Sequence, residues 1–161
     1  MTATKAKQFP SKDTCRVLIL GCGNSTFGND MRNDDWKGPI SNIDFSAVVI
    51  EQMQRKYKDI MDFVCADVTK GLPFEDESFD LIICKGTLDA VLCSSGSIAN
   101  VKAVVAECSR VLDRDHGIFF LVSFGNPDSR VVFLEHENDI SHYWKKLHID
   151  TLSRQNQRGH K

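Results

Sequence analysis

Short apolar runs alternate along this chain with segments whose apolar residues recur at helical spacing. The run at 15–20 is almost continuously apolar, which is typical of a strand covered on both faces of a sheet. Parallel strands need a crossover between them, usually a helix. The alternation therefore predicts an α/β fold with a mainly parallel sheet between two layers of helices. We expect strands at 15–20, 40–45, 62–65, 79–84, 117–124 and 143–152, and helices at 25–32, after Ser46, at 98–112 and at 129–137.

Length and charge limit the classes of protein to which the chain can belong. Its 161 residues predict a single domain at 15–152, between a short flexible N-terminus (1–14) and a polar tail (153–161). The formal net charge of −2 gives no general attraction to nucleic acids or membranes. The N-terminus lacks the apolar core of a signal peptide, and no apolar run approaches the roughly 18 residues of a membrane span. We therefore expect neither a membrane nor a nucleic acid as a partner.

The six cysteines form no C-x-x-C pair, and Cys65 and Cys84 lie inside apolar runs, where thiols behave as small buried hydrophobes. This usage indicates a reducing compartment, and we expect a cytoplasmic protein, although a nuclear or organellar location stays open. The histidines at 136, 142 and 148 recur every six residues and so would lie on different faces of a helix. We expect no metal site.

The first apolar run ends in the stretch VLILGCGNST, at 17–26, which predicts a ligand-binding turn. Gly21 and Gly23 remove side chains where the backbone turns sharply and a ligand comes close. Asn24 and Ser25 are candidates to cap the helix that follows, whose N–H groups favour a carboxylate or another anion. Ligands of parallel α/β sheets bind at the carboxyl ends of strands, so this turn marks where to search.

Polar residues follow the next three predicted strands as well. Asp44 ends the second strand, 21 residues beyond Gly23, at about the spacing of an acid that binds ribose hydroxyls. Asp67 and Val68 follow the third strand and combine a carboxylate with an apolar surface, which suits a ring with an exocyclic amine. The segment at 85–89 follows the fourth strand and contains two ionisable groups. Together these strand ends predict an adenosine-type ligand.

Two adenosine-type ligands compete for this site. A dinucleotide site needs the fingerprint G-x-G-x-x-G, whose third glycine allows the helix to pack closely on the strand. Thr26 stands at that third position, so the fingerprint fails. S-adenosylmethionine carries no pyrophosphate, and G-x-G followed by Asn and Ser suffices for it. The residues therefore favour S-adenosylmethionine over a nicotinamide cofactor, and an oxidoreductase is the weaker alternative.

Four segments resemble, in order and spacing, the class I S-adenosylmethionine-dependent methyltransferases, which have a Rossmann-like three-layer fold. The element KGTLDA resembles more specifically the eukaryotic methyltransferase-like group that includes elongation factor 1-alpha lysine methyltransferases. Against that group, the chain looks like a core shortened at both ends, without an aromatic N-terminal segment and without the final antiparallel strand. The four segments are VLILGCGNS, IDFSAVVIEQM, ADVTKGLPFEDESFDLIICKGTLDAVL and ECSRVLDRDHGIFFLVSF.

The resemblance implies a role for each strand end. Gly21 would lie under the methionine moiety, Asp44 would bind the ribose with Phe45 against the adenine, and Lys85 would lie near the sulfonium. Asp67 and Val68 would bind the edge and face of the adenine. The full cofactor-binding set that we expect is Gly21, Cys22, Gly23, Asn24, Asp44, Phe45, Asp67, Val68 and Lys85.

The resemblance implies methylation of a lysine or another amine on a protein, with a translation elongation factor as a candidate substrate. Asp89 is the candidate catalytic residue, because a carboxylate can orient the acceptor amine. The alternative for Lys85 and Asp89 is a surface ion pair. No Asp/Asn-Pro-Pro-Tyr element follows the fourth strand, which argues against base amines of nucleic acids. A non-catalytic S-adenosylmethionine-binding or protein-interaction module is the second functional hypothesis.

Overall fold

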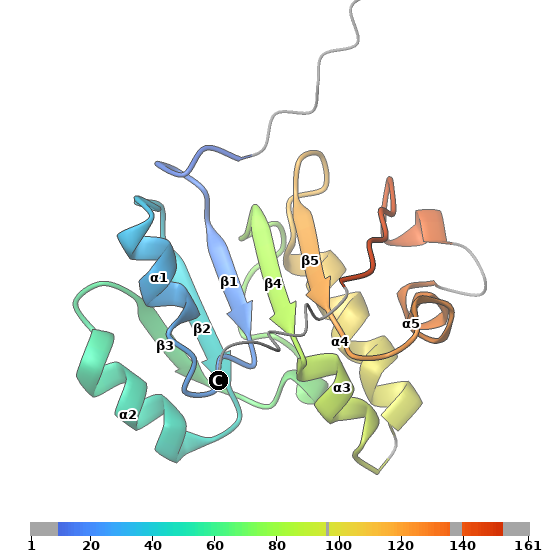
Figure 1. The fold of residues 1–161 in the computed structure, drawn as a ribbon, viewed down its shortest axis with the longest axis horizontal. Coiled ribbons are helices and arrows are strands. Elements are labelled where there is room, and N and C mark those ends of the chain that lie inside the picture. The colour runs from blue at the N-terminus through green and yellow to red at the C-terminus, as the bar shows by residue number, and fades with distance from the viewer. Residues whose placement is uncertain (1–9, 96, 136–139, 153–161) are drawn as a thin grey trace, which may run out of the picture.

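The computed structural model describes residues 10–95, 97–135 and 140–152. Its centre is a sheet in which all neighbouring strands are parallel, in the order β3-β2-β1-β4-β5 (Figure 1). This arrangement confirms the predicted α/β architecture. The strands are β1 (Val17–Leu20), β2 (Ile40–Asp44), β3 (Asp62–Cys65), β4 (Leu81–Lys85) and β5 (Ile118–Val122).

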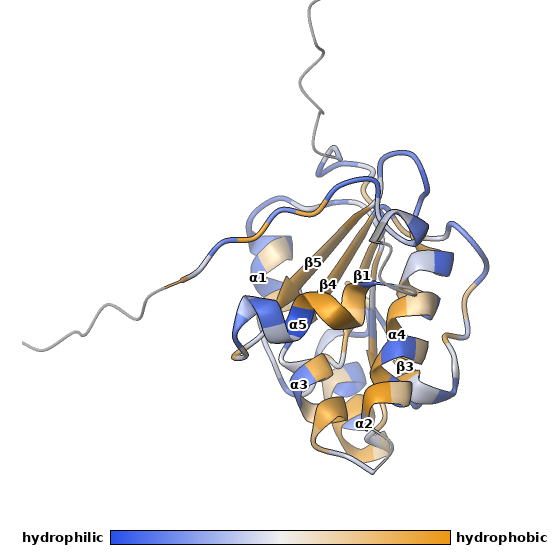
Figure 2. Cartoon of the chain, turned by 90° about the vertical axis from the view of Figure 1, so that its right-hand side faces the viewer, coloured by the Kyte–Doolittle hydropathy of each residue, from blue (hydrophilic) through white to orange (hydrophobic). Residues whose placement is uncertain are grey.

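Helices cover both faces of the sheet, as Figure 2 shows for α1 and α4 on opposite sides of the apolar strands. A short 3-10 turn, η1 (Val68–Lys70), follows β3, and a second, η2 (Ile140–His142), follows α5. In the described parts of the chain, no helix is both long and apolar enough to cross a bilayer. The helices are α1 (Phe27–Asn33), α2 (Ala47–Tyr57), α3 (Thr87–Leu92), α4 (Ser97–Val111) and α5 (Pro127–Leu134).

Alternate residues of each inner strand supply two separate apolar cores. In β1, Val17 and Ile19 belong to the core under α1 and α2, whereas Leu18 and Leu20 belong to the core under α4. All four side chains are buried, which is why the run is apolar throughout and not alternating. Because both cores pack against the sheet, its strands are held rigidly between the helices. The loops at the carboxyl edge therefore begin at strand ends whose positions are fixed.

The predicted strand at 143–152 is wrong, because the described residues contain no strand after β5. The side chains of Tyr143, Trp144 and Leu147 pack onto the core on the α4 face instead. Trp144 stacks on Phe119 of β5 with ring centroids 5.1 Å apart, and its indole N–H donates to the carbonyl oxygen of Leu134 at 2.9 Å. The helix predicted at 129–137 begins earlier, at Pro127, and ends at Leu134; residues 136–139 lie outside the described ranges.

Candidate functional site

The site predicted from the strand ends lies at the carboxyl edge of the sheet, where all five strands end on the same side (Figure 1). β1 pairs with β2 on one side and with β4 on the other. The chain therefore moves outward from β1 through β2 and β3, and then returns to the other side of β1 at β4, so that the strand order reverses at β1. Such a switch point opens a crevice beyond the strand ends, where α/β proteins bind their ligands. The glycine turn after β1 lies at this position.

Gly21 and Gly23 both adopt positive φ angles, of +63° and +52°, which favour glycine. The two positions differ in their surroundings. A Cβ on Gly21 would lie 2.3 Å from Oγ1 of Thr87, whereas a Cβ on Gly23 would meet no atom within 4 Å. Thr87 begins α3, and its hydroxyl donates to the carbonyl oxygen of Leu20 at 2.7 Å. The turn after β1 therefore packs against α3 at Gly21 and leaves open space at Gly23.

This difference predicts unequal effects of alanine at the two glycines. Gly21→Ala adds both backbone strain and a clash with Thr87, and we expect it to lower the free energy of unfolding by about 3 kcal/mol. Gly23→Ala adds only the strain, and we expect about 1–2 kcal/mol. Urea denaturation of the ligand-free variants measures both values. Equal losses in the two variants would contradict the packing of Gly21 against Thr87.

Asp44 joins the loops that follow β1 and β2. One carboxylate oxygen accepts the N–H of Gly23 at 2.9 Å, and the other accepts the N–H of Ser46 at 2.9 Å. The side chain is one of two buried polar side chains in the described chain, at 8% exposure. Each carboxylate oxygen has a second lone pair, so Asp44 can still accept hydrogen bonds from a ligand. Asp44 is the last residue of β2 and so lies at the carboxyl edge, and its role in binding a ligand stays a prediction.

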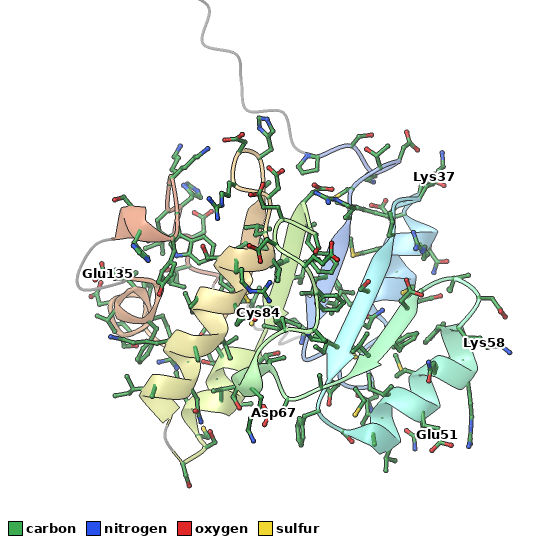
Figure 3. The ribbon with its side chains drawn as sticks, turned by 180° about the vertical axis from the view of Figure 1, so that it is seen from behind. Lys37, Glu51, Lys58, Asp67, Cys84 and Glu135 are labelled. Atoms are coloured by element: carbon green, nitrogen blue, oxygen red, sulfur yellow. The ribbon has the colours of Figure 1, made fainter. Side chains whose placement is uncertain are left out.

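Phe45, Asp67 and Val68 complete the side of the site beyond β2 and β3. The Phe45 ring is 79% exposed, so it is available to a ligand. Figure 3 shows Asp67 at the edge of the sheet. One oxygen of Asp67 accepts both the N–H and the hydroxyl of Thr69, and these bonds hold the pKa of Asp67 below its usual value. Val68 is buried in the core on the α4 face and exposes little side chain to a ligand.

Two residues of the predicted cofactor set have other local roles. The Cys22 side chain is buried in the core under α1 and α2, and this burial raises the pKa of its thiol to about 12. Cys22 can therefore face a ligand only through its backbone. Asn24 is exposed and does not cap α1, contrary to the expectation. Instead, the hydroxyl of Ser25 accepts the N–H of Phe27 at 3.2 Å.

Lys85 and Asp89 do not form the ion pair that was the alternative for them. Lys85 is exposed at the end of β4, whereas Asp89 pairs with Arg130 of α5 at 3.0 Å. Asp89 also accepts the hydroxyl of Ser123 at 2.6 Å and the N–H of Phe124 at 3.1 Å. Burial alone would raise the pKa of Asp89, but these hydrogen bonds and Arg130 outweigh it and hold the pKa below its usual value. Sequence reasoning missed both Ser123 and Arg130, because no local pattern connects them to Asp89.

An open apolar groove lies elsewhere, on the face of β4 and β5 beside α1. It is lined mainly by apolar side chains, including Phe27, Trp36, Ile118 and Phe120, with Asp30 of α1 and Asp34, which follows α1. Since the glycine turn and Asp44 do not line it, this groove is not the predicted ligand site. The predicted site lies instead at the carboxyl edge, around the glycine turn and Asp44.

A family model described as a methyltransferase domain matches residues 18–121, which is more than half of the chain. This chain belongs to the methyltransferase-domain family. The match covers all five strands except Val17 and Val122, and it includes the glycine turn, Asp44, Asp67 and Lys85. The predicted family is therefore confirmed.

Two curated relatives of this methyltransferase-domain chain are named for elongation factor methylation. Mouse eEF1A lysine and N-terminal methyltransferase is 38% identical over 102 residues, which cover 60% of this chain and 14% of that protein. Mouse EEF1A lysine methyltransferase 4 is 32% identical over 126 residues, which cover 72% of this chain and 48% of that protein. The chain thus spans less than half the length of either relative.

Solved structures confirm the Rossmann-like fold of the domain. A SAM-dependent methyltransferase from Methanosarcina mazei superposes with a TM-score of 0.60 at 18% identity, over 75% of this chain and 57% of the other. The PH0226 protein from Pyrococcus horikoshii OT3 superposes with a TM-score of 0.56 at 26% identity, over 68% of this chain and 49% of the other.

The residues at the carboxyl edge fit S-adenosylmethionine, the cofactor that the family assignment indicates. The open space at Gly23 admits a ligand close to the backbone, and Asp44 keeps lone pairs for ribose hydroxyls. The exposed Phe45 ring lies beside Asp44, where an adenine would follow the ribose. Lys85 is exposed at the opposite side of the glycine turn, at the end of β4.

Proposed function

We propose that this chain is the catalytic core of an S-adenosylmethionine-dependent methyltransferase that methylates a lysine of a protein. Translation elongation factor 1A is the candidate substrate. The observation that carries this proposal is the 38% identity to a protein named as an eEF1A lysine and N-terminal methyltransferase, together with a carboxyl edge that fits the cofactor.

The chain's own residues would bind the cofactor and leave one side of it open. Gly23 and Asp44 would hold the nucleoside on the β1–β2 side of the edge, and the exposed end of β4 borders the other side. When bound, S-adenosylmethionine supplies a methyl group: an N–C bond forms as the S–C bond breaks, S-adenosylhomocysteine leaves, and the nitrogen loses a proton. A lysine amine has an ordinary pKa of about 10.4, so the site must favour its neutral form by removing it from water.

A cytoplasmic location is part of the same proposal. All six cysteines lie within the described residues, and each is a free thiol. Free thiols at this number are typical of a reducing compartment.

The proposal predicts transfer of label to elongation factor 1A. We expect calorimetry to detect binding of S-adenosylmethionine but not of NAD. We then expect tritiated S-adenosylmethionine to label recombinant elongation factor 1A, with mass spectrometry placing the methyl group on a lysine. The Asp44→Ala variant, purified in parallel, serves as the control with an impaired cofactor site.

Two outcomes would contradict this prediction in different ways. Binding of NAD without binding of S-adenosylmethionine would reject the cofactor. Cofactor binding without any labelled protein, either elongation factor 1A or proteins of a cell extract, would support the non-catalytic binding module instead.

A further inference from the structure

An aromatic ring projects at the carboxyl edge on the side away from the glycine turn. Phe124 is 88% exposed and follows β5 by two residues. Val122, the last residue of β5, is the register partner of Lys85 at the end of β4. Phe124 therefore lies beyond the strand end that neighbours Lys85, with β4 between it and the glycine turn after β1. No residue in the predicted cofactor set comes from β5 or from the loop that follows it.

The backbone that carries the ring is held by hydrogen bonds, although the ring itself is exposed. The N–H of Phe124 donates to one oxygen of Asp89 at 3.1 Å, and the hydroxyl of Ser123 donates to the other at 2.6 Å. The N–H of Gly125 donates to the hydroxyl of Ser123 at 3.2 Å. These hydrogen bonds fix the main chain that carries the exposed ring, as a preformed binding surface requires.

Arg130 connects this segment to α5. Its Nε donates to the Ser123 hydroxyl at 2.8 Å, and its Nη2 pairs with Asp89 at 3.0 Å. The guanidinium also packs against Gly125, where an added Cβ would lie 2.1 Å from Cζ of Arg130. The side chains of Arg130 and Asp89 are only 25% and 18% exposed. We call Asp89, Ser123 and Arg130 the brace.

The brace is continuous with the glycine turn through the first turn of α3. Asp89 lies in this turn, and Figure 1 shows α3 beneath the ends of β4 and β5. The N–H of Gly86 donates to the carbonyl oxygen of Val122 at 2.9 Å, and the Thr87 hydroxyl donates to Leu20. Because Thr87 also contacts Gly21, one hydrogen-bonded unit extends from the cofactor turn to Phe124.

We propose that Phe124 forms a wall of the subsite for an acceptor amine and its methylene stem, and that Asp89, through Ser123 and Arg130, is a positioning residue that holds Phe124 there. This inference rests on the proposed methyl transfer to an amine. A phenyl face attracts an ammonium group and packs against methylenes, so it suits a lysine side chain. One oxygen of Asp89 accepts hydrogen bonds from Ser123 and Arg130 and the other accepts the N–H of Phe124, and so Asp89 acts on the amine through the position of Phe124 and not by contact.

A stem-bearing analogue tests the subsite without any protein substrate. The probe is S-adenosylhomocysteine whose sulfur is replaced by a nitrogen that carries a 2-(butylamino)ethyl arm, so that an amine and a butyl chain extend toward the acceptor side. We expect calorimetry to show that the wild-type chain binds this probe about tenfold more tightly than S-adenosylhomocysteine. Phe124→Ala should remove most of this gain and leave the affinity for S-adenosylhomocysteine unchanged.

Phe120→Ala is the matched control, because Phe120 is also an exposed phenylalanine, at 53% exposure, but lies within β5 and lines the groove beside α1. This variant should keep the full gain in affinity for the probe over S-adenosylhomocysteine. A full gain in Phe124→Ala, or no gain in the wild-type chain, would overturn the subsite. If elongation factor 1A is not labelled but the gain depends on Phe124, the proposed substrate fails while the subsite stands.

A double-mutant cycle tests the positioning role of Asp89. We expect Asp89→Asn and Arg130→Ala each to reduce the gain, and the double variant to reduce it no further than the more severe single variant. Gly125→Ala, which displaces the guanidinium without removing a charge, should reproduce Arg130→Ala. Independent, multiplying effects of Asp89→Asn and Arg130→Ala would show that Asp89 contacts the amine directly, which would overturn its role as a positioning residue.

Discussion

Replacing Asp44 by alanine is expected to reduce the affinity for S-adenosylmethionine by at least about 100-fold. Two hydrogen bonds from ribose hydroxyls to a carboxylate contribute roughly 3 kcal/mol together, which corresponds to this factor. The variant also leaves the N–H groups of Gly23 and Ser46 without their acceptor, so the loops that shape the site lose their connection. Isothermal titration calorimetry measures the loss in affinity.

Asp44→Asn is the matched control for this prediction. Its amide oxygen can accept from Gly23 or from Ser46 but not from both with the geometry of a carboxylate, so an intermediate affinity is expected. Thermal unfolding of the ligand-free variants shows whether each one is folded at the temperature of the titration. Unchanged affinity in a folded Asp44→Ala variant would remove Asp44 from the cofactor site.

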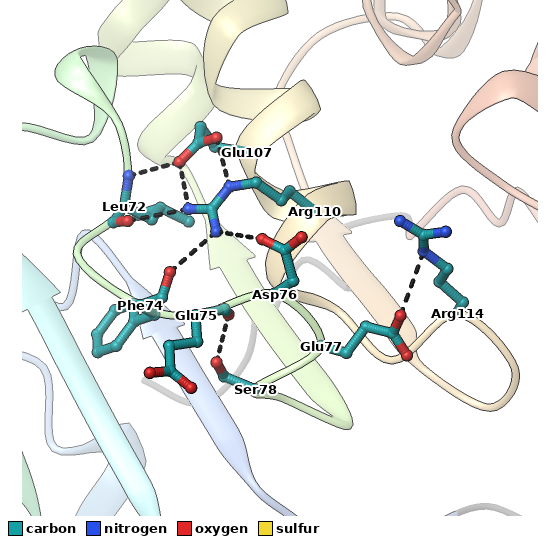
Figure 4. A network of polar contacts seen from close by, with 9 residues as sticks. All are labelled: Leu72, Phe74, Glu75, Asp76, Glu77, Ser78, Glu107, Arg110 and Arg114. Carbon is teal, nitrogen blue, oxygen red and sulfur yellow. Dashed lines mark hydrogen bonds and ion pairs between the residues drawn. The ribbon is translucent and has the colours of Figure 1, made fainter.

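Replacing Arg110 by alanine is expected to lower the free energy of unfolding by about 2–3 kcal/mol, and the Tm by roughly 5–10 °C. Figure 4 shows the guanidinium at the centre of a network that ties α4 to the loop between η1 and β4. It donates to both oxygens of Glu107, to Asp76 and to the carbonyl oxygens of Leu72 and Phe74. Calorimetric melting and urea denaturation measure the loss.

Arg114→Ala is the matched control, because Arg114 lies nearby but forms one exposed ion pair, with Glu77 at 3.3 Å. Such a pair contributes about 0–1 kcal/mol. Arg110→Lys keeps the charge but not the planar set of donors, so it should recover little of the stability. Similar losses for Arg110→Ala and Arg114→Ala would show that the network around Arg110 adds nothing beyond surface charge.

The Arg110 network also predicts a dependence on pH. The hydrogen bonds from Arg110 hold the pKa of Glu107 below its usual value. A lowered folded-state pKa stabilises the protein fully above the unfolded value of about 4.3, and this contribution is lost as the pH falls through the folded value. The stability difference between the wild-type chain and Arg110→Ala should therefore narrow as the pH is lowered from neutral into this acidic range.

Local patterns were sufficient to predict most of the sheet. The buried run of β1 and the glycine turn after it are both visible within ten residues of sequence, and Asp44 follows at a recognisable spacing. The segment at 143–152 shows where a local pattern fails. Tyr143, Trp144 and Leu147 are apolar enough for a strand, but their side chains pack against the core on the α4 face without strand pairing.

The sequence by itself determined the α/β class and the strand ends of the predicted cofactor edge, because apolar periodicity and turn residues act over a few neighbouring positions. The family followed from the resemblance of four segments to known methyltransferases, which the match to the family model confirms. Only the tertiary structure decided which partner Asp89 takes. Arg130 lies 41 residues further along the chain than Asp89, and it reaches that carboxylate only once α5 has followed β5 back across α4. Lys85 lies only four residues before Asp89 in the sequence but forms no ion pair with it. The ion pair with Lys85, which nearness in sequence had offered as an alternative, does not form, and the packing of α3, β5 and α5 determined the observed pair with Arg130.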